Sequence, residues 1–119
     1  MYILNDKLFT LDFKFNLLLI KEILLRGNYA TIKQLIGYDL PYFLLKSIRK
    51  AKDFNITTLC LLSLRQLLLR LKENDSESYD YLVEMFFELD GVATLQLLMN
   101  CDNVVCKNLS NLILETNFN

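Results

Sequence analysis

Residues 56–72 read ITTLCLLSLRQLLLRLK, and this stretch decides the fold. It is apolar on most of its circumference when wound as a helix, so we predict one long helix that is largely buried. Such a helix needs further helices around it to cover its apolar surface. The stretch therefore predicts an all-α fold.

The composition of the whole chain supports the same fold class. Of the 119 residues, 53% are hydrophobic, only three are Gly and one is Pro. A small all-β fold needs many turns, and so few Gly and Pro residues do not supply them. The length fits a single domain, which we place at residues 1–119, and it suffices for a core without disulfides or metals.

Breaks in the apolar periodicity divide the chain into six or seven helices. The predicted helices span residues 13–26, 29–36, 40–50, 56–72, 76–88 (or from Ser78), 91–100 and 103–116. Asp12 is the expected cap of the first helix, Asp39 caps the third with Pro41 in its first turn, and Asp102 or Asn103 caps the last. Residues 1–11 fit either a strand-like arm or a further helix.

The breaks recur along the chain. The breaks at residues 37–41 and 89–91 lie about 50 residues apart, and so do the starts of the two long helices near Asn55 and Asn103. Recurrence on this scale is typical of a helical repeat array, in which each unit buries its apolar face by stacking on its neighbours.

Three stretches resemble the helices of armadillo repeats. Residues 39–48 (DLPYFLLKSI) resemble a second helix, residues 90–98 (DGVATLQLL) resemble the same element one repeat later, and residues 103–112 (NVVCKNLSNL) resemble a third helix. The order of elements from Phe15 to Phe118 is similar to the last two and a half repeats of importin-alpha adapters. The resemblance implies a short armadillo/HEAT-type α-solenoid that binds another macromolecule.

Importin-alpha adapters bind nuclear-localisation signals through a Trp and, four residues later, an Asn on each third helix. The resemblance places the candidate groove at the pairs Leu18/Glu22, Leu62/Gln66 and Lys107/Asn111. The chain has no Trp, and only Asn111 keeps the family's residue type. A reduced adapter that binds basic peptides for nuclear transport is the alternative function.

Charge is unevenly distributed, although the net charge is −1. Residues 14–72 carry eleven Lys and Arg against three acids, and residues 73–119 carry nine acids against Lys107 alone. The molecule thus presents two differently charged surfaces. The candidate contact for RNA phosphate or an acidic protein consists of Lys46, Arg49, Lys50 and Lys52. The candidate acidic docking face consists of Glu77, Asp80, Glu84 and Glu88.

Each charged cluster also has a simpler interpretation. The basic residues end a predicted helix, where cations are favourable against the helix dipole. The acidic residues lie three or four apart, as on a solvated helix face. The alternatives are a salt-sensitive contact with ribosomal RNA for the first cluster and a dock for a basic partner for the second.

The aromatic residues and the ends of the array complete this interpretation. We expect the core between repeats to contain Tyr79, Tyr81, Phe86 and Phe87, with the alternative that some of these residues form a hydrophobic surface patch. Tyr38 and Tyr42 are interpreted as packing residues, with base stacking as the alternative. A short array has two open ends, so we expect one end to be buried against a partner or a second copy of the chain.

The sequence does not point to catalysis, a cofactor or a small-molecule substrate. It has no His, no Gly-rich phosphate loop and no Ser in a nucleophile elbow. Cys60, Cys101 and Cys106 do not form a CxxC pair, and we interpret them as small core residues rather than metal ligands.

No membrane contact is expected. The apolar stretches fall short of the roughly 18 uncharged residues that a spanning helix needs, because residues such as Arg65 and Arg70 interrupt the longest one. Residues 1–11 lack the features of a secretory signal. We expect a cytoplasmic protein, with the nucleus as the alternative.

Together these features predict a non-enzymatic interaction module. We expect a short armadillo-like stack that docks on a larger protein or ribonucleoprotein assembly. The charge polarity suggests a ribosome-associated stabilising, dormancy or dimerisation factor.

Overall fold

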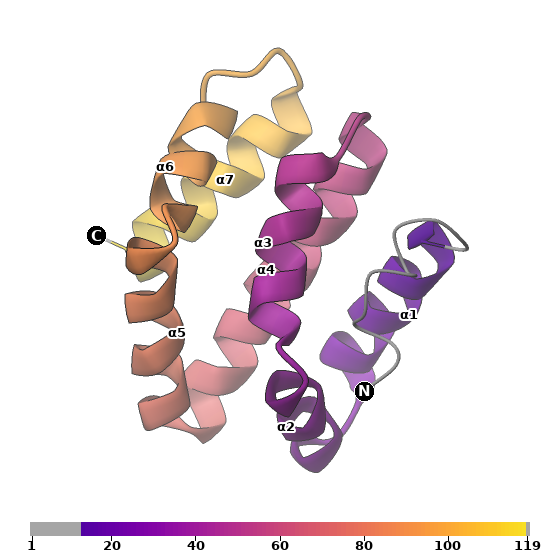
Figure 1. The fold of residues 1–119 in the computed structure, drawn as a ribbon, viewed down its shortest axis with the longest axis vertical. Coiled ribbons are helices and arrows are strands. Elements are labelled where there is room, and N and C mark those ends of the chain that lie inside the picture. The colour runs from indigo at the N-terminus through magenta and orange to yellow at the C-terminus, as the bar shows by residue number, and fades with distance from the viewer. Residues whose placement is uncertain (1–12, 119) are drawn as a thin grey trace.

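The computed structural model describes residues 13–118, which form seven α-helices and no strand (Figure 1). The helices are α1 (Phe13–Arg26), α2 (Tyr29–Gly37), α3 (Leu40–Lys50), α4 (Phe54–Asn74), α5 (Ser76–Glu88), α6 (Gly91–Leu98) and α7 (Val104–Asn117). The all-α prediction is confirmed. The arm or helix expected at residues 1–11 and the Asp12 cap lie outside the described residues.

Four helices, α2, α4, α6 and α7, differ from their predicted bounds by one or two residues at an end. α4 is longer because Asp53 caps it, accepting a hydrogen bond from the Ile56 N–H at 2.9 Å. α5 has its predicted bounds and begins at Ser76 rather than Ser78, because its cap is Asp75, whose Oδ1 accepts from the Ser78 N–H at 3.1 Å. α6 ends at Leu98 because its last turn tightens: the N–H groups of residues 100 and 101 bond three residues back.

Asp39 is the N-cap residue of α3, as predicted, but its side chain makes no capping hydrogen bond. Asp39 and Asp90 both have a left-handed backbone, with φ of 64° and 59°, and neither makes a side-chain capping bond. Their N–H groups bond instead to the carbonyls of Ile36 at 3.1 Å and Phe87 at 3.3 Å. One left-handed residue turns the chain directly into the next helix, and Asp tolerates that conformation better than most residues.

α4 lies at the centre of the fold and packs against α1, α3, α5 and α7. In Figure 1 it runs behind α3, with α1 to one side and α7 to the other. Its buried residues are Thr57, Leu59, Cys60, Leu61, Ser63, Leu64, Leu67, Leu68 and Leu71. The long core helix expected from the sequence is therefore present, and the other helices supply its cover.

α4 is also long and apolar enough to cross a membrane, unlike the other helices between residues 13 and 118. Arg65 and Arg70, which we counted as interruptions, both lie within this helix. However, 50% of the apolar segment of α4 is buried inside this fold, as in the core helix of a soluble protein. Arg70 within it donates hydrogen bonds to the carbonyls of Leu24 at 3.0 Å and Gly27 at 2.7 Å, so it ties α4 to the end of α1.

The six helices after α1 fall into two sets of three with matching caps. The paired cap residues are Asn28 and Asp75, Asp39 and Asp90, and Asp53 and Asn103. The members of each pair lie about 50 residues apart, which is the scale of a helical repeat. The recurrence of the sequence breaks thus extends to the geometry of the caps.

Polar contacts join corresponding places in the two sets. The Tyr29 hydroxyl donates to Asp75 Oδ2 at 3.2 Å, which links the start of α2 to the start of α5. Thr58 Oγ1 and Cys106 Sγ lie 3.3 Å apart and link the start of α4 to the start of α7. Because each contact spans more than forty residues of sequence, these contacts help to fix how the two sets stack.

Candidate protein-interaction groove

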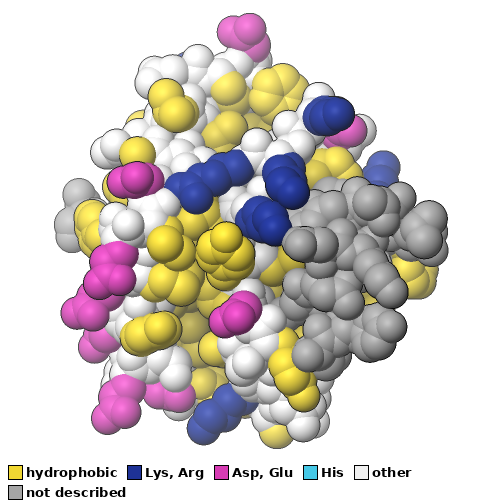
Figure 2. Space-filling view, viewed as in Figure 1, with side chains coloured by type: hydrophobic (Ala, Val, Ile, Leu, Met, Phe, Trp, Pro, Cys, Tyr) yellow, Lys and Arg dark blue, Asp and Glu magenta, His cyan; other side chains and the backbone are white. Residues whose placement is uncertain are grey.

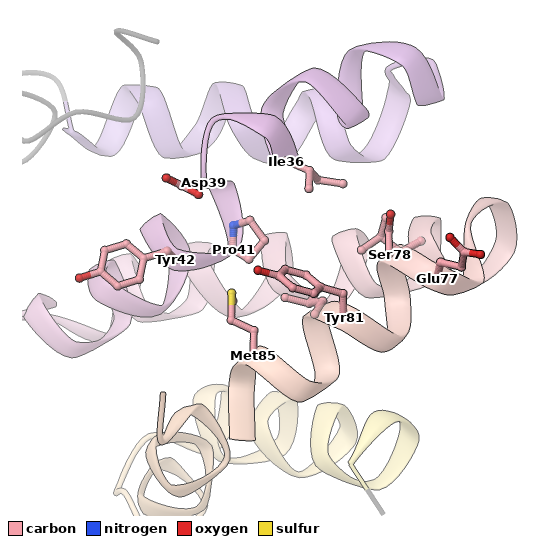
Figure 3. A pocket seen from close by; sticks show the side chains of 10 residues that line it. Ile36, Asp39, Pro41, Tyr42, Glu77, Ser78, Tyr81 and Met85 are labelled. Carbon is pink, nitrogen blue, oxygen red and sulfur yellow. The ribbon is translucent and has the colours of Figure 1, made fainter. Parts of the chain in front are cut away.

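A groove opens between the start of α3 and the side of α5 (Figure 3), and its cavity has a volume of about 320 Å³. Its floor includes Leu71 of α4 and Leu82 of α5, both buried. In Figure 3 the side chains of Pro41, Tyr81 and Met85 face one another across the groove. An apolar cavity of this size is large enough to receive the side chains of a binding partner.

Two tyrosines stand at the mouth of the groove and are largely open to solvent. Tyr42 of α3 is 49% exposed and Tyr81 of α5 is 70% exposed. Aromatic side chains that combine an apolar ring with a polar tip are enriched at protein interfaces. The groove therefore combines an apolar floor with the residue type that often dominates binding energy.

Local sequence explains the two walls. The left-handed Asp39 ends the turn after α2, and Pro41 follows in the first turn of α3, where its missing N–H costs nothing. On α5 the side chains of Glu77, Tyr81 and Met85 lie four residues apart. This spacing places them along one face of the helix, so all three reach the same groove.

The charged residues that line the groove are all acidic. Asp39 lies near Tyr42 at one end, and Glu77 lies on α5 at the other end (Figure 3). In Figure 2 acidic side chains follow the α5 edge of this face, hydrophobic side chains gather in its middle, and basic side chains lie above them. The groove thus has an acidic rim and an apolar interior.

A small hydrogen-bond network rigidifies the α5 end of the groove. Asp75 accepts hydrogen bonds from the Ser78 hydroxyl at 2.8 Å and from the Tyr29 hydroxyl at 3.2 Å. The bonds from Ser78 are the main cause that lowers the pKa of the Asp75 carboxyl. Burial, followed by the contact with Asp75, raises the pKa of Tyr29. Asp75 is therefore a structural carboxylate, and Ser78 lines the groove beside it.

The predicted basic contact lies outside this groove, at the end of α3. Arg49 donates a hydrogen bond to Thr94 Oγ1 at 3.2 Å and another to the carbonyl of Leu89. Its guanidinium therefore joins α3 to the turn between α5 and α6. Lys46 is half-buried, and Lys50 and Lys52 are exposed. Whether this cluster contacts RNA stays a prediction.

The three groove pairs drawn from the adapter resemblance lie on α1, α4 and α7. These helices are neighbours, since α4 packs against both α1 and α7. Leu18, Glu22 and Lys107 are exposed, and Leu62, Gln66 and Asn111 are half-buried. Glu22 pairs with Arg26 at 3.2 Å, and Asn111 donates to Glu115 at 3.2 Å. None of these residues lines the groove between α3 and α5.

The predicted acidic docking face lies entirely on α5. Its members Glu77, Asp80, Glu84 and Glu88 are all exposed, and Glu77 also lines the groove. The structure thus brings part of this predicted face next to an apolar cavity. No sequence pattern predicted the cavity, because its other wall comes from α3, more than thirty residues earlier in the chain.

The core assignment of the aromatic residues needs correction. Phe86 is fully buried and stacks on Phe118 with ring centroids 5.7 Å apart, and Tyr79 is half-buried. Tyr81 and Phe87, however, are mostly exposed. Helical geometry explains the split, because a neighbour at i+1 or i+2 points to a different face of the helix. The exposure of Tyr81 and Phe87 agrees instead with the alternative that part of this stretch forms a hydrophobic surface patch.

The described part of the chain contains no group of three or more His, Cys, Asp or Glu side chains suited to a metal ion. Cys60 and Cys106 are buried, and Cys101 is half-buried. Burial raises the pKa of the Cys60 thiol to about 12 and also raises that of Cys106. Both thiols are protonated at neutral pH, so they pack as small apolar groups.

Comparison with known proteins gives no match: no protein family, no curated protein and no solved structure is significantly similar to this chain. The function of the groove therefore rests on its own residues.

Proposed function

We propose that this chain is a short helical-repeat module that binds a segment of a partner protein in the groove between α3 and α5. The observation that carries the proposal is the pair of exposed tyrosines, Tyr42 and Tyr81, at the mouth of a cavity of about 320 Å³. Exposed apolar surface of this kind costs solubility unless a partner covers it.

The repeat character is part of the proposal. The matching caps of α2–α4 and α5–α7 support an array of two three-helix units, and α1 supplies the last helix of a unit before them. This arrangement agrees with the two and a half armadillo-like repeats implied by the sequence resemblance. Arrays of this kind bind partners along extended surfaces.

A protein partner has better support than RNA as the main ligand. RNA binding requires cations that are available to phosphate oxygens. Arg49 is held by Thr94 and the carbonyl of Leu89, so the strongest phosphate-binding residue of the basic cluster is already engaged. The Tyr81 ring and the cavity beside it have no partner of this kind among the contacts of the described residues.

Site-specific photo-crosslinking tests this proposal. A benzoylphenylalanine residue replaces Tyr81 in the full chain, and the protein is irradiated in extract from its native cell. The matched control carries the same group at Leu97, which is 75% exposed on α6 and does not line the groove. We expect a discrete crosslinked protein at position 81, identified by mass spectrometry, and none at position 97.

Equal labelling at the two positions, or no protein adduct at position 81, would contradict the proposal. Crosslinks at position 81 to RNA rather than to protein would replace it with the ribonucleoprotein alternative.

A further inference from the structure

The acidic rim of the groove selects the chemistry of its partner. Glu77 and Glu84 lie four residues before and three residues after Tyr81, and Glu88 lies seven residues after it. All three acids therefore stand on the same side of α5 as Tyr81. Asp39 adds a carboxylate from the opposite wall. A ligand whose apolar side chain enters beside Tyr81 meets negative charge along the groove.

These carboxylates have no counter-ion within the described residues. The one salt bridge there joins Glu22 and Arg26 on α1. From residue 73 to residue 106 the sequence contains no Lys or Arg. Of the cations near the groove, Lys33 interacts electrostatically with Asp75, Lys72 lies 5.7 Å from the centre of the Tyr79 ring, and Arg49 is bound to Leu89 and Thr94. A partner is thus left to supply the positive charge.

The interior of the groove sets a second requirement for the partner, which is an apolar side chain. Leu71 and Leu82 form a buried apolar floor, and Pro41, Tyr81 and Met85 face the space above it. Filling this cavity with an aliphatic or aromatic side chain removes apolar surface from water on both partners. A purely charged ligand would leave the cavity unfilled.

We infer that the groove binds a basic segment of a partner protein, with one large apolar anchor side chain seated beside Tyr81 and flanking Lys or Arg side chains against Glu77, Glu84 and Asp39. This inference rests on the proposed function and adds the partner's chemistry to it. The anchor supplies affinity, and the charges speed association and exclude acidic segments. The site is distinct from the predicted pairs on α1, α4 and α7.

Fluorescence anisotropy with synthetic peptides tests the inference on the full chain. The first probe is a fluorescein-labelled peptide with a central Leu-Leu pair flanked by Lys on both sides. The second replaces every Lys with Glu, and the third keeps Lys but replaces both Leu with Ser. We expect only the first to bind, with affinity that falls severalfold when the salt concentration rises from about 50 mM to about 300 mM.

Variants locate the binding site. Tyr81→Ser and Glu77→Lys should each weaken binding of the first peptide by about tenfold. Leu97→Ser, which changes an exposed apolar residue away from the groove, should leave it unchanged. All three sites are exposed, and circular dichroism confirms that each variant remains folded.

Each contrary result overturns the inference. If the acidic peptide binds as well as the basic one, the charge assignment fails while the proposed function stands. Binding that is unaffected by Tyr81→Ser places the site elsewhere. If none of the three peptides binds, the inference is wrong, and the crosslinking experiment then shows whether the proposed function stands. A dimer in sedimentation that Tyr81→Ser dissolves assigns the groove to a second copy of the chain.

Discussion

The set α2–α4 and the set α5–α7 have matching caps but very different burial. In α3 seven residues are buried, whereas in α6 only Gly91 and Leu95 are. In α4 nine residues are buried, against three in α7. The first set is covered on two sides, because α4 packs against α1 as well as α7. The position of each helix in the fold, rather than local sequence signals, decides how much of it is core.

The two sets also differ in charge. The basic residues gather in the part of the chain that ends with α4, and the acidic residues gather from the end of α4 through α5. The groove lies on this boundary, with one wall from each set. The set α2–α4, the inner set, is thus basic and the set α5–α7, the outer set, is acidic, and the proposed partner contacts the acidic side.

The difference in burial between the two sets predicts the largest effect on stability for substitutions in the core. Leu64 of α4 and Leu95 of α6 are both fully buried, so Leu64→Ala and Leu95→Ala remove the same atoms. We expect Leu64→Ala to lower the free energy of unfolding by about 4 kcal/mol and Leu95→Ala by about 2–3 kcal/mol. The cavity at Leu64 is enclosed on more sides and collapses less. Urea denaturation measures both losses, and equal losses would refute the distinction between an inner and an outer set.

A glycine in each set gives the next contrast. A Cβ added at Gly91 would lie 2.4 Å from Cδ2 of the buried Phe86 ring, whereas one added at Gly37 would have no atom within 4 Å. Gly91→Ala should cost about 1–3 kcal/mol because the ring is stacked on Phe118 and has little room to move. Gly37→Ala should be neutral or stabilise by about 0.5 kcal/mol. Thermal unfolding compares the two; a neutral Gly91→Ala would show that Phe86 repacks freely.

The contact between the two sets predicts a smaller effect. Arg49 joins α3 to Leu89 and Thr94, whereas Lys52 lies exposed in the loop after α3. Arg49→Ala should lower the free energy of unfolding by about 1 kcal/mol, since solvent weakens an exposed charged hydrogen bond. Lys52→Ala should change it by less than about 0.5 kcal/mol.

The same two variants test the role of the basic cluster. RNA retention in a filter-binding assay at low salt should be similar for wild type, Arg49→Ala and Lys52→Ala. A large loss with Lys52→Ala, at unchanged stability, would restore the ribonucleoprotein contact predicted from the sequence.

Much of this fold could be predicted from sequence because its signals are local. Apolar periodicity located all seven helices, and Gly, Asn and Asp residues located most of their ends. Asp39 shows the limit: the residue type marks the break correctly, but its left-handed backbone depends on how α2 and α3 meet.

The groove could be predicted only in part, because it depends on tertiary structure. Acidic residues four apart on α5 indicated the charged face. The cavity beside it requires that the start of α3 lie opposite Tyr81, and no local pattern encodes that distance. Tyr81 was assigned to the core because aromatic residues usually are buried, and its side of α5 became known only from packing.

The smallest predicted effect concerns the caps that begin each set. Asn28 accepts a hydrogen bond from the Thr31 N–H at 2.9 Å, and Asp75 does the same for Ser78 at 3.1 Å. The pKa of Asp75 is lowered in the folded state, chiefly by the hydrogen bonds from Ser78. A lowered pKa means that the ionised cap stabilises the fold above the ordinary Asp pKa of about 3.9, and that this stabilisation is lost as the pH falls through the folded-state value.

Asn28 carries an amide and does not titrate, so acid should weaken the cap of α5 and leave the cap of α2 intact. We expect the melting temperature of Asp75→Asn to fall less steeply than that of wild type between about pH 5 and pH 3. Asn28→Asp should do the reverse and acquire a steeper fall, because it places a titrating cap at the corresponding position of the inner set. Parallel curves for all three proteins would mean that the two caps, although alike in geometry, do not contribute alike to stability.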